Sequence, residues 1–293
     1  MAKKTEKTII DSVYLNPRTD FGFKKMFFNK GLLINFLNDI IREEGRIIDI
    51  EYLPFEQLGD WDTNRKAVFD IYCKNEKGEY FIVEMQKAIQ AHFLDRSLFY
   101  AASSIWNQAP KGKWNYELKT VYFVAIMNFI QFKEKESKPY YIERAYLFRD
   151  RAKEKFSEKM NMIFIELPKF TKSVEELTTN EDKWLFIFKN LDQLKSYLPE
   201  IKGEIFEEIF KIMQIKKLTS KEMEEYKVSV TEYEDIQEAM EIVRKEGIEE
   251  GRFEERLEVA INCLQDGLSV ETVSKLTKLS VDQVKGILKK LKR

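Results

Sequence analysis

The sequence predicts an α/β fold: an α/β domain over about residues 1–170, followed by an all-helical C-terminal extension. Three observations favour this class. Two β-like runs flank a short turn at residues 74–78, and an almost uninterrupted apolar run follows at 119–129. From residue 171 onward, apolar residues recur at helical spacing. The chain has 293 residues, of which 44% are hydrophobic and 34% charged, so it can bury a core and keep a polar surface.

The first elements are helical. Residues 16–44 begin with a turn and a helix-capping sequence, Asn16-Pro17-Arg18-Thr19, and continue as two apolar periodic stretches separated by Gly31. Residues 46–54 then predict a strand that ends at Pro54.

The middle of the domain is rich in strands. Residues 66–73 and 79–86 predict a β-hairpin around the turn that ends in Gly78. The segment that follows predicts a helix over about 88–107, a buried central strand at 119–129 and weaker strands near 139–149 and 160–167.

The C-terminal part is helical throughout. Helices are expected within 171–198 and at 203–215, so that residues 171–235 form a helical extension packed on the core. An acidic stretch over 218–258 predicts either a long exposed helix or a mobile connector, weakened by Gly247 and Gly251.

The last region, 236–293, ends in three expected short helices at about 259–264, 270–276 and 281–291, an arrangement similar to a helix-turn-helix unit. The basic residues near its end would allow it to read DNA. The favoured alternative to DNA binding is that this unit is a helical cap or a dimerisation element. Basic residues in the last turn of a helix interact favourably with the helix dipole, so they do not by themselves indicate DNA binding. These basic residues are Lys285, Lys289, Lys290, Lys292 and Arg293.

The composition excludes several kinds of chemistry. Cys73 and Cys263 are the only cysteines, which is too few for a disulfide framework or a cysteine-rich zinc site. His92 is the only histidine, so a histidine-based triad or a zinc enzyme is disfavoured. We expect a cytoplasmic protein, since the sequence has neither a signal-like segment at its N-terminus nor a run long enough to span a membrane. If the protein is an enzyme, the catalytic groups that remain are carboxylates acting with a hard metal ion.

The hairpin brings two carboxylates together. Side chains alternate between the faces of a strand, so Asp70 should share a face with Tyr72, and Phe69 should share the opposite face with Ile71. If the hairpin folds about Lys77, residue 72 lies opposite 82, and 70 opposite 84. The Cβ atoms of directly opposed residues are about 5 Å apart, where like charges are destabilising.

A divalent cation would stabilise Asp70 and Glu84 in this arrangement. Mg²⁺ prefers oxygen ligands, accepts one or two carboxylates and keeps several waters. Gln86 lies two residues beyond Glu84 on the same face, where it can orient a water or a phosphate oxygen. The alternative is that the two acids bind no metal and simply lie on a solvated sheet face. The D…ExQ pattern is short and common, so it does not exclude this alternative.

Several ordered motifs resemble a known family. Residues 16–27, the hairpin segments 69–71 and 81–86, the helix 93–100 and the loop and strand at 111–129 are similar to the recombination-promoting nuclease (Rpn)/putative transposase family, a group of PD-(D/E)XK nucleases. The resemblance covers about residues 10–170 well and the C-terminal third loosely.

This resemblance implies a restriction-endonuclease-like mixed sheet flanked by helices and hydrolysis of DNA with Mg²⁺, with Mn²⁺ as the alternative ion. It also implies that Asp70 and Glu84 are metal ligands and that the protein acts in recombination or mobile-element biology. Gln86 stands where the wider superfamily usually has lysine, and an amide cannot supply the positive charge of that residue.

Two further pairs are candidate auxiliary residues. Asp20 and Lys24 share a helix face that borders the active site in the resembling family, or they form a surface ion pair. Arg96 and Tyr100, also four residues apart, are placed to contact a phosphate. For this second pair, helix packing by the tyrosine with an arginine that extends to solvent is the favoured alternative.

The function that these observations favour is an Mg²⁺-dependent DNA endonuclease. One alternative is a catalytically silent DNA-binding protein that keeps the fold. The other is a protein-interaction module in which residues 218–258 and the C-terminal helices bind a partner or self-associate as a homo-oligomer. DNA is the expected partner, and no membrane association is expected.

Overall fold

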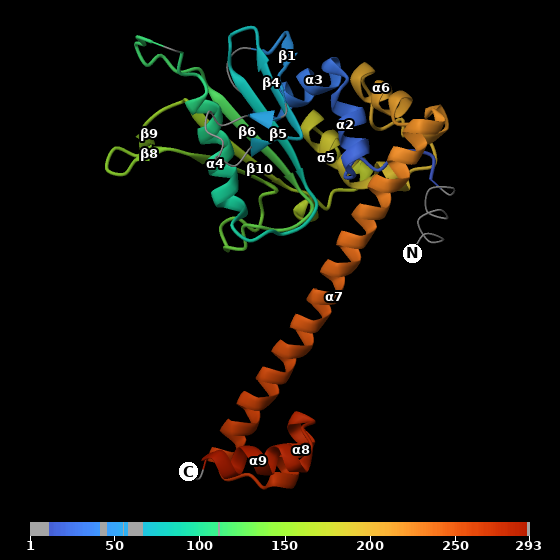
Figure 1. Ribbon diagram of the computed structural model, residues 1–293. Helices are drawn as coiled ribbons and strands as arrows, with labels where there is room; N and C mark the ends of the chain where they lie inside the picture. The colour runs from blue at the N-terminus through green and yellow to red at the C-terminus, as the bar shows by residue number, and fades with distance from the viewer. Residues whose placement is uncertain (1–11, 42–45, 55, 58–66, 111, 292–293) are drawn as a thin grey trace. The chain divides into compact units, whose positions relative to one another are not determined.

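A six-stranded mixed sheet forms the core of the protein in the computed structural model, which describes residues 12–41, 46–54, 56–57, 67–110 and 112–291 (Figure 1). The strand order is β1-β4-β5-β6-β10-β7. Strand β5 pairs in parallel with β6, and β6 with β10, whereas the other pairs are antiparallel. The bounds are β1 (Ile50–Tyr52), β4 (Ile71–Asn75), β5 (Tyr80–Gln86), β6 (Val121–Met127), β7 (Ile142–Tyr146) and β10 (Met160–Glu166). The α/β class and the mixed sheet are therefore confirmed.

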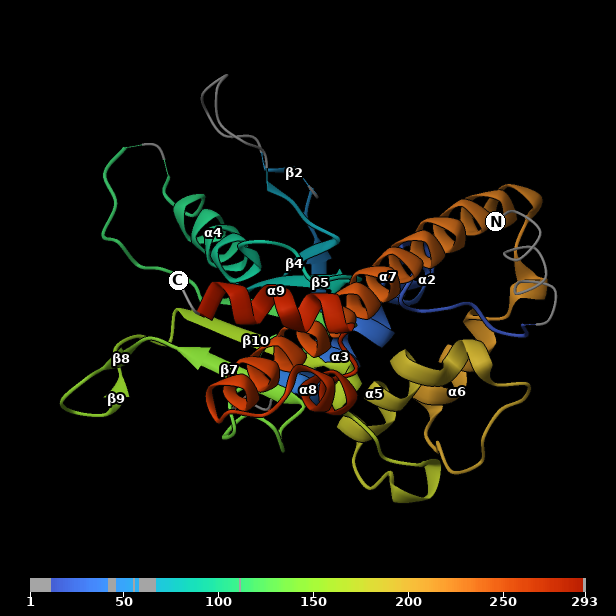
Figure 2. The same ribbon diagram turned by 90° about the horizontal axis from the view of Figure 1, so that it is seen from below.

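Helices cover both faces of this sheet (Figures 1 and 2). One face packs against a group of four: α2 (Asp20–Phe27), α3 (Lys30–Ile41), α5 (Asn180–Asn190) and α6 (Glu204–Ile212). The other face packs against α4 (Phe93–Trp106), where the Phe93 ring lies 6.1 Å from that of Phe164. Because both faces are covered, every residue of β6 is buried, which explains its nearly continuous apolar sequence.

Two short two-stranded sheets complete the strands. Strand β2 (Glu56–Gln57) pairs with β3 (Ala67–Val68), and β8 (Phe148–Arg149) pairs with β9 (Glu154–Lys155). The hairpin turn between β4 and β5 is closed by the Asn75 side chain, whose oxygen accepts from the backbone N–H groups of Lys77 and Glu79. Gly78 adopts φ 78°, a conformation that favours glycine.

Helix α7 (Ser220–Gln265) occupies the stretch for which the sequence allowed a helix or a mobile connector. The helix continues through Gly247 and Gly251. It also includes residues 259–264, so the first of the three expected short helices is instead the end of this long one. The other two are α8 (Val270–Thr277) and α9 (Val281–Leu291).

The chain divides into two compact units, one up to Ile236 and one from Gln237 onward. Within the first unit, helices α5 and α6 share a single core with the sheet. The second unit has a small core of its own from α7, α8 and α9, formed by Ala260, Leu264, Val273, Leu279 and Val284. Some expected features lie outside the described residues: helical residues 42–44, strand residue 66, and Lys111, Lys292 and Arg293.

Candidate active site

The β4–β5 hairpin has the register that the sequence predicts. Tyr72 lies opposite Ile82, and Lys74 opposite Tyr80. The two acids at its open end hold each other through the backbone. The Asp70 N–H donates to Glu84 Oε1 at 3.1 Å, and the Met85 N–H donates to Asp70 Oδ2 at 2.8 Å. Each carboxylate is therefore fixed by the strand that carries the other one.

Asp70 itself lies in a bend between β3 and β4, where the chain passes from the small β2–β3 sheet to the large one. Strict alternation of side chains fails at this break. Phe69, expected on the face of Ile71, instead packs on the opposite face, with its ring 5.0 Å from that of Tyr72 and 5.1 Å from that of Tyr100. The prediction for Phe69 was wrong because residue 69 precedes the strand.

Glu84 is buried in the sheet, and Asp70 is half-buried beside it. Glu84 is 5% exposed, so the alternative of a solvated sheet face is wrong for this residue. Burial, and then the negative charge of Asp70, raise the pKa of Glu84 to about 8. Burial also raises the pKa of Asp70, although its hydrogen bond from Met85 acts in the opposite direction. The site therefore requires positive charge to keep both groups ionised.

Gln86 connects Glu84 to the helix above the sheet. Its Nε2 donates to Glu84 Oε2 at 3.0 Å, and its Oε1 accepts from the Arg96 guanidinium. This amide orientation is the one that both neighbours require, because a carboxylate can only accept and a guanidinium can only donate. Arg96 also donates to Gln90, a contact for which the sequence gives no spacing signal.

Tyr100 and Arg96 both reach the acid pair from α4. The Arg96 guanidinium lies 5.8 Å from the centre of the Tyr100 ring. Burial raises the pKa of Tyr100, and the negative charges of Glu84 and Asp70 add to this effect. The positive charge of Arg96 lowers the pKa of Glu84. The structure thus brings the candidate pair Arg96 and Tyr100 to the same end of the hairpin as the acids.

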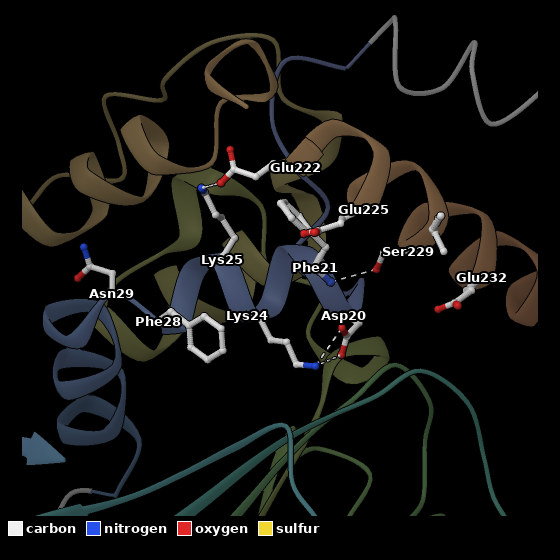
Figure 3. A pocket seen from close by; sticks show the side chains of 11 residues that line it. Asp20, Phe21, Lys24, Lys25, Phe28, Asn29, Glu222, Glu225, Ser229 and Glu232 are labelled. Carbon is white, nitrogen blue, oxygen red and sulfur yellow. Dashed lines mark hydrogen bonds and ion pairs between the residues drawn. The ribbon is translucent and has the colours of Figure 1, made fainter. Parts of the chain in front are cut away.

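Asp20 and Lys24 form an ion pair on α2, with Lys24 Nζ 2.9 Å from Asp20 Oδ1 (Figure 3). The pair faces the strands, and its charges act on the acids. The positive charge of Lys24 lowers the pKa of Asp70 and Glu84, against the larger effect of burial. Asp20 raises the pKa of Asp70. Lys87, which the sequence places on the other face, also lowers the pKa of Asp70.

A cavity of about 870 Å³ lies between α2 and the first turns of α7 (Figure 3). Lys25 from α2 closes one side through an ion pair with Glu222 of α7, at 2.5 Å. The lining carries lysines from α2 and several glutamates from α7, so its charge is mixed. This is not the pattern of a surface that binds polyanions.

Three polar side chains of α7 hold the segments that carry the site. Tyr226 Oη accepts from the Asn16 N–H at 2.9 Å, and Ser229 Oγ accepts from the Phe21 N–H at 3.0 Å. Tyr233 Oη accepts from Asn128 Nδ2 at 3.1 Å, and the N–H of Asn128 donates to the Gln86 carbonyl at 2.9 Å. Sequence spacing does not predict these contacts, because a tyrosine in an acidic helix carries no signal for its distant partner.

The donor set fits a hard divalent ion. The two adjoining carboxylates supply oxygen ligands, and the remaining positions can be filled by water. No group of three or more His, Cys, Asp or Glu side chains among the described residues has the arrangement of a metal site.

Comparison with protein-family models finds one match, over residues 17–242, to a family described as PD-(D/E)XK nuclease family transposase. The match extends over more than half of the chain. Comparisons with curated proteins and with solved structures give no match. Separately, no described helix combines the length and the apolar character that a membrane crossing requires.

Proposed function

Because this chain belongs to the PD-(D/E)XK nuclease family transposases, we propose that it is an endonuclease that hydrolyses phosphodiester bonds in DNA with Mg²⁺. The observation that best supports this proposal is the close pair of Asp70, which is half-buried, and Glu84, which is buried. Burial raises the pKa of both carboxyls, and the negative charge of Asp70 raises that of Glu84 further; a bound cation would offset this unfavourable charge. Mn²⁺ is the alternative ion.

Asp70 and Glu84 are the metal ligands in this proposal. When bound, the ion lowers the pKa of a coordinated water and polarises the phosphodiester. Gln86 orients a water or a phosphate oxygen next to the acids. Its side chain brings no charge, and the guanidinium of Arg96 that bonds to it is the nearby source of positive charge that the usual lysine would provide.

The auxiliary residues surround this centre. Lys24 supplies a second positive charge that favours ionisation of both acids. Asp20 holds Lys24 through their ion pair, and the Tyr100 ring lies beside the Arg96 guanidinium. A role in recombination or in mobile-element biology, a cytoplasmic location and self-association are further parts of the proposal.

The test is nicking of supercoiled plasmid by the full-length protein with Mg²⁺. Loss of a metal ligand removes electrostatic stabilisation worth about 10²–10³-fold in rate, so Asp70→Asn and Glu84→Gln should both lose nicking by at least this factor. The matched control is Asp150→Asn, an exposed acid in the β8–β9 region, which should nick like the wild type. A wild type that binds DNA but does not nick it supports the silent DNA-binding alternative.

A second readout does not depend on activity. A ligand that binds only the folded state stabilises it, by about 1.4 kcal/mol at ten times its dissociation constant. For a domain of this size we expect Mg²⁺ to raise the melting temperature by about 3–6 °C. The Asp70→Asn variant should show no such rise. An equal rise in both proteins would mean that the ion binds elsewhere.

A further inference from the structure

One side of α4 carries a row of residues that leads away from the acid pair. Arg96, Phe99, Ser103 and Trp106 are spaced by three, four and three residues, so they lie on one side of the helix. We call these four residues the aromatic face. Phe99 is 50% exposed and Trp106 is 79% exposed. Exposed large rings cost free energy in water, which makes this face a candidate binding surface.

The aromatic face begins at the proposed catalytic centre. Arg96 bonds to Gln86, next to Glu84. The Phe99 ring centre lies 6.3 Å from that of Tyr100, whose ring in turn packs on Phe69 at 5.1 Å. A continuous series of rings therefore runs from the bend that carries Asp70 to the surface of α4.

The rings continue in the segment after α4. The Gln108 side chain accepts from the Lys119 N–H at 2.7 Å and donates to the Lys119 carbonyl at 3.1 Å, so it closes the base of this segment. Beyond this closure, the rings of Trp114 and Tyr116 lie 5.1 Å apart. Tyr116 is 80% exposed at φ 61°, a backbone conformation unfavourable for a residue with a side chain.

The segment stands away from the sheet at the C-terminal end of α4 (Figures 1 and 2). Lys113, which is also exposed, adds positive charge next to these rings.

We propose that a single-stranded stretch of nucleic acid lies along the aromatic face, with unpaired bases stacked on Phe99 and Trp106 and, in the segment after α4, on Tyr116. This inference rests on the proposed function and names its substrate: DNA with unpaired bases at or beside the scissile bond. From Arg96 to Trp106 the helix rises about 15 Å. That length matches about four nucleotides at about 3.4 Å each.

The charge of the aromatic face favours a single strand over duplex DNA as the substrate. A duplex buries the faces of its bases and is held chiefly through phosphates, which requires a surface rich in Lys and Arg. The aromatic face has Arg96 as its one basic residue, and the chain carries a net charge of −1. Rings stack on bases of any sequence, but only where the bases are unpaired.

A second copy of the chain is the other occupant to consider, since exposed apolar side chains also mark protein interfaces. Leu94 and Leu98 are exposed on the opposite flank of α4, where they do not continue the row from Arg96. The rings of Phe69, Tyr100 and Phe99 connect the bend that carries Asp70 to this surface, which favours the substrate of the proposed catalytic centre.

The test measures binding without cleavage. Full-length protein in EDTA is titrated into a fluorescein-labelled thymidine 20-mer and, separately, into a labelled 20-base-pair duplex, with anisotropy as the readout. We expect the single strand to bind at least tenfold more tightly. Phe99→Ala and Trp106→Ala should each weaken its binding by about five- to a hundredfold, the range for loss of one base–aromatic stack, without a change for the duplex.

Two control variants sharpen the result. Trp106→Phe keeps a ring and should retain most of the affinity, whereas Leu98→Ala removes an exposed apolar side chain from the other flank and should have no effect. Equal or tighter binding of the duplex, or an unchanged affinity in both ring variants, overturns the proposal. It is also overturned if the wild type sediments as a dimer and the ring variants as monomers, with single-strand affinity unchanged.

The two experiments distinguish failure of the single-strand binding proposal from failure of the nuclease proposal. If the rings bind single strands but no plasmid nicking occurs with Mg²⁺, the nuclease proposal fails and the binding face stands. If Asp70-dependent nicking occurs and the ring variants bind like the wild type, the nuclease proposal stands and this inference fails.

Discussion

At the scale of single residues, the chemistry of the site depends on Gln86. The amide donates to Glu84 and accepts from Arg96, so it carries a polar connection from a buried acid to a cation on α4. A lysine at this position would place a charge directly beside the acids. Here the charge lies one side chain further away, on a residue whose planar group also packs against Tyr100.

We therefore expect Arg96→Gln to lower nicking activity while the protein stays folded. Removal of a group that orients a residue beside a metal ligand typically costs about 10- to 100-fold. Plasmid nicking at saturating Mg²⁺ measures the loss, and circular dichroism checks the fold. Arg149→Gln, a change at an exposed arginine on β8, is the matched control and should behave like the wild type. Full activity in the Arg96 variant would remove this residue from the mechanism.

At the scale of elements, α2 is held in place by close backbone packing. Thr19 caps the helix: its Oγ1 accepts from the Gly22 N–H at 3.0 Å and donates to the Asn16 carbonyl at 2.8 Å. A Cβ on Gly22 would lie 2.0 Å from the same carbonyl oxygen. The start of α2, which carries Asp20, therefore requires glycine at position 22.

Gly22→Ala should accordingly destabilise the protein by about 1–3 kcal/mol, because the added methyl group forces the backbone of residue 16 away from the helix. Urea unfolding gives this difference in the free energy of unfolding. Gly31→Ala is the matched control. Its Cβ would meet Asn29 Oδ1 at 3.4 Å, so it should be neutral or slightly stabilising. Equal effects of the two substitutions would contradict the packing argument.

Helix α7 contacts α2 through an ion pair that responds to pH. The hydrogen bond from Lys25 is the main cause that lowers the pKa of Glu222 from 4.5 to about 2. A carboxyl with a lowered pKa in the folded state stabilises the fold above its unfolded pKa, and this contribution disappears as the pH falls through the folded value. The relevant window is thus about pH 4.5 to 2.

Glu222→Gln should be less stable than the wild type at pH 6, by less than about 1 kcal/mol because the pair is partly exposed. The difference should shrink as the pH falls below 4.5 and vanish near pH 2. Urea unfolding of both proteins between pH 2 and 6 measures it, and high salt should reduce it. A difference that grows toward low pH would contradict the assignment of this ion pair.

At the scale of the whole molecule, the boundary at residue 236 separates a unit with the sheet from a helical one with its own core. The anchoring residues Tyr226, Ser229 and Tyr233 all precede this boundary. A chain that ends at residue 236 therefore keeps every α7 contact described at the site.

We expect this shortened chain to fold, with a cooperative thermal transition, and to keep Mg²⁺-dependent nicking within about threefold of the full-length rate, since its site contacts are unchanged. Sedimentation velocity of both chains then shows whether residues 237–293 are responsible for any self-association. Loss of nicking in a folded, shortened chain would assign the C-terminal unit a part in the reaction.

The sequence predicted most of this architecture because its signals were local. The hairpin register followed from the position of the turn, and the buried β6 followed from its unbroken apolar run. The misplaced Phe69 and the missed contacts of Tyr226 and Tyr233 have a different origin. They depend on a bend between two sheets and on partners more than 100 residues away, which no local spacing encodes.

The bend at Asp70 has an evolutionary consequence. Since the two acids accept hydrogen bonds from each other's strands, they brace the open end of the hairpin whether or not an ion is present. A descendant that has lost its chemistry would still be under pressure to retain both residues for architecture alone. The Arg96 side chain, in contrast, bonds to the side chains of Gln86 and Gln90 and not to the backbone of the hairpin in the described residues, so its persistence among relatives is the more informative mark of a working enzyme.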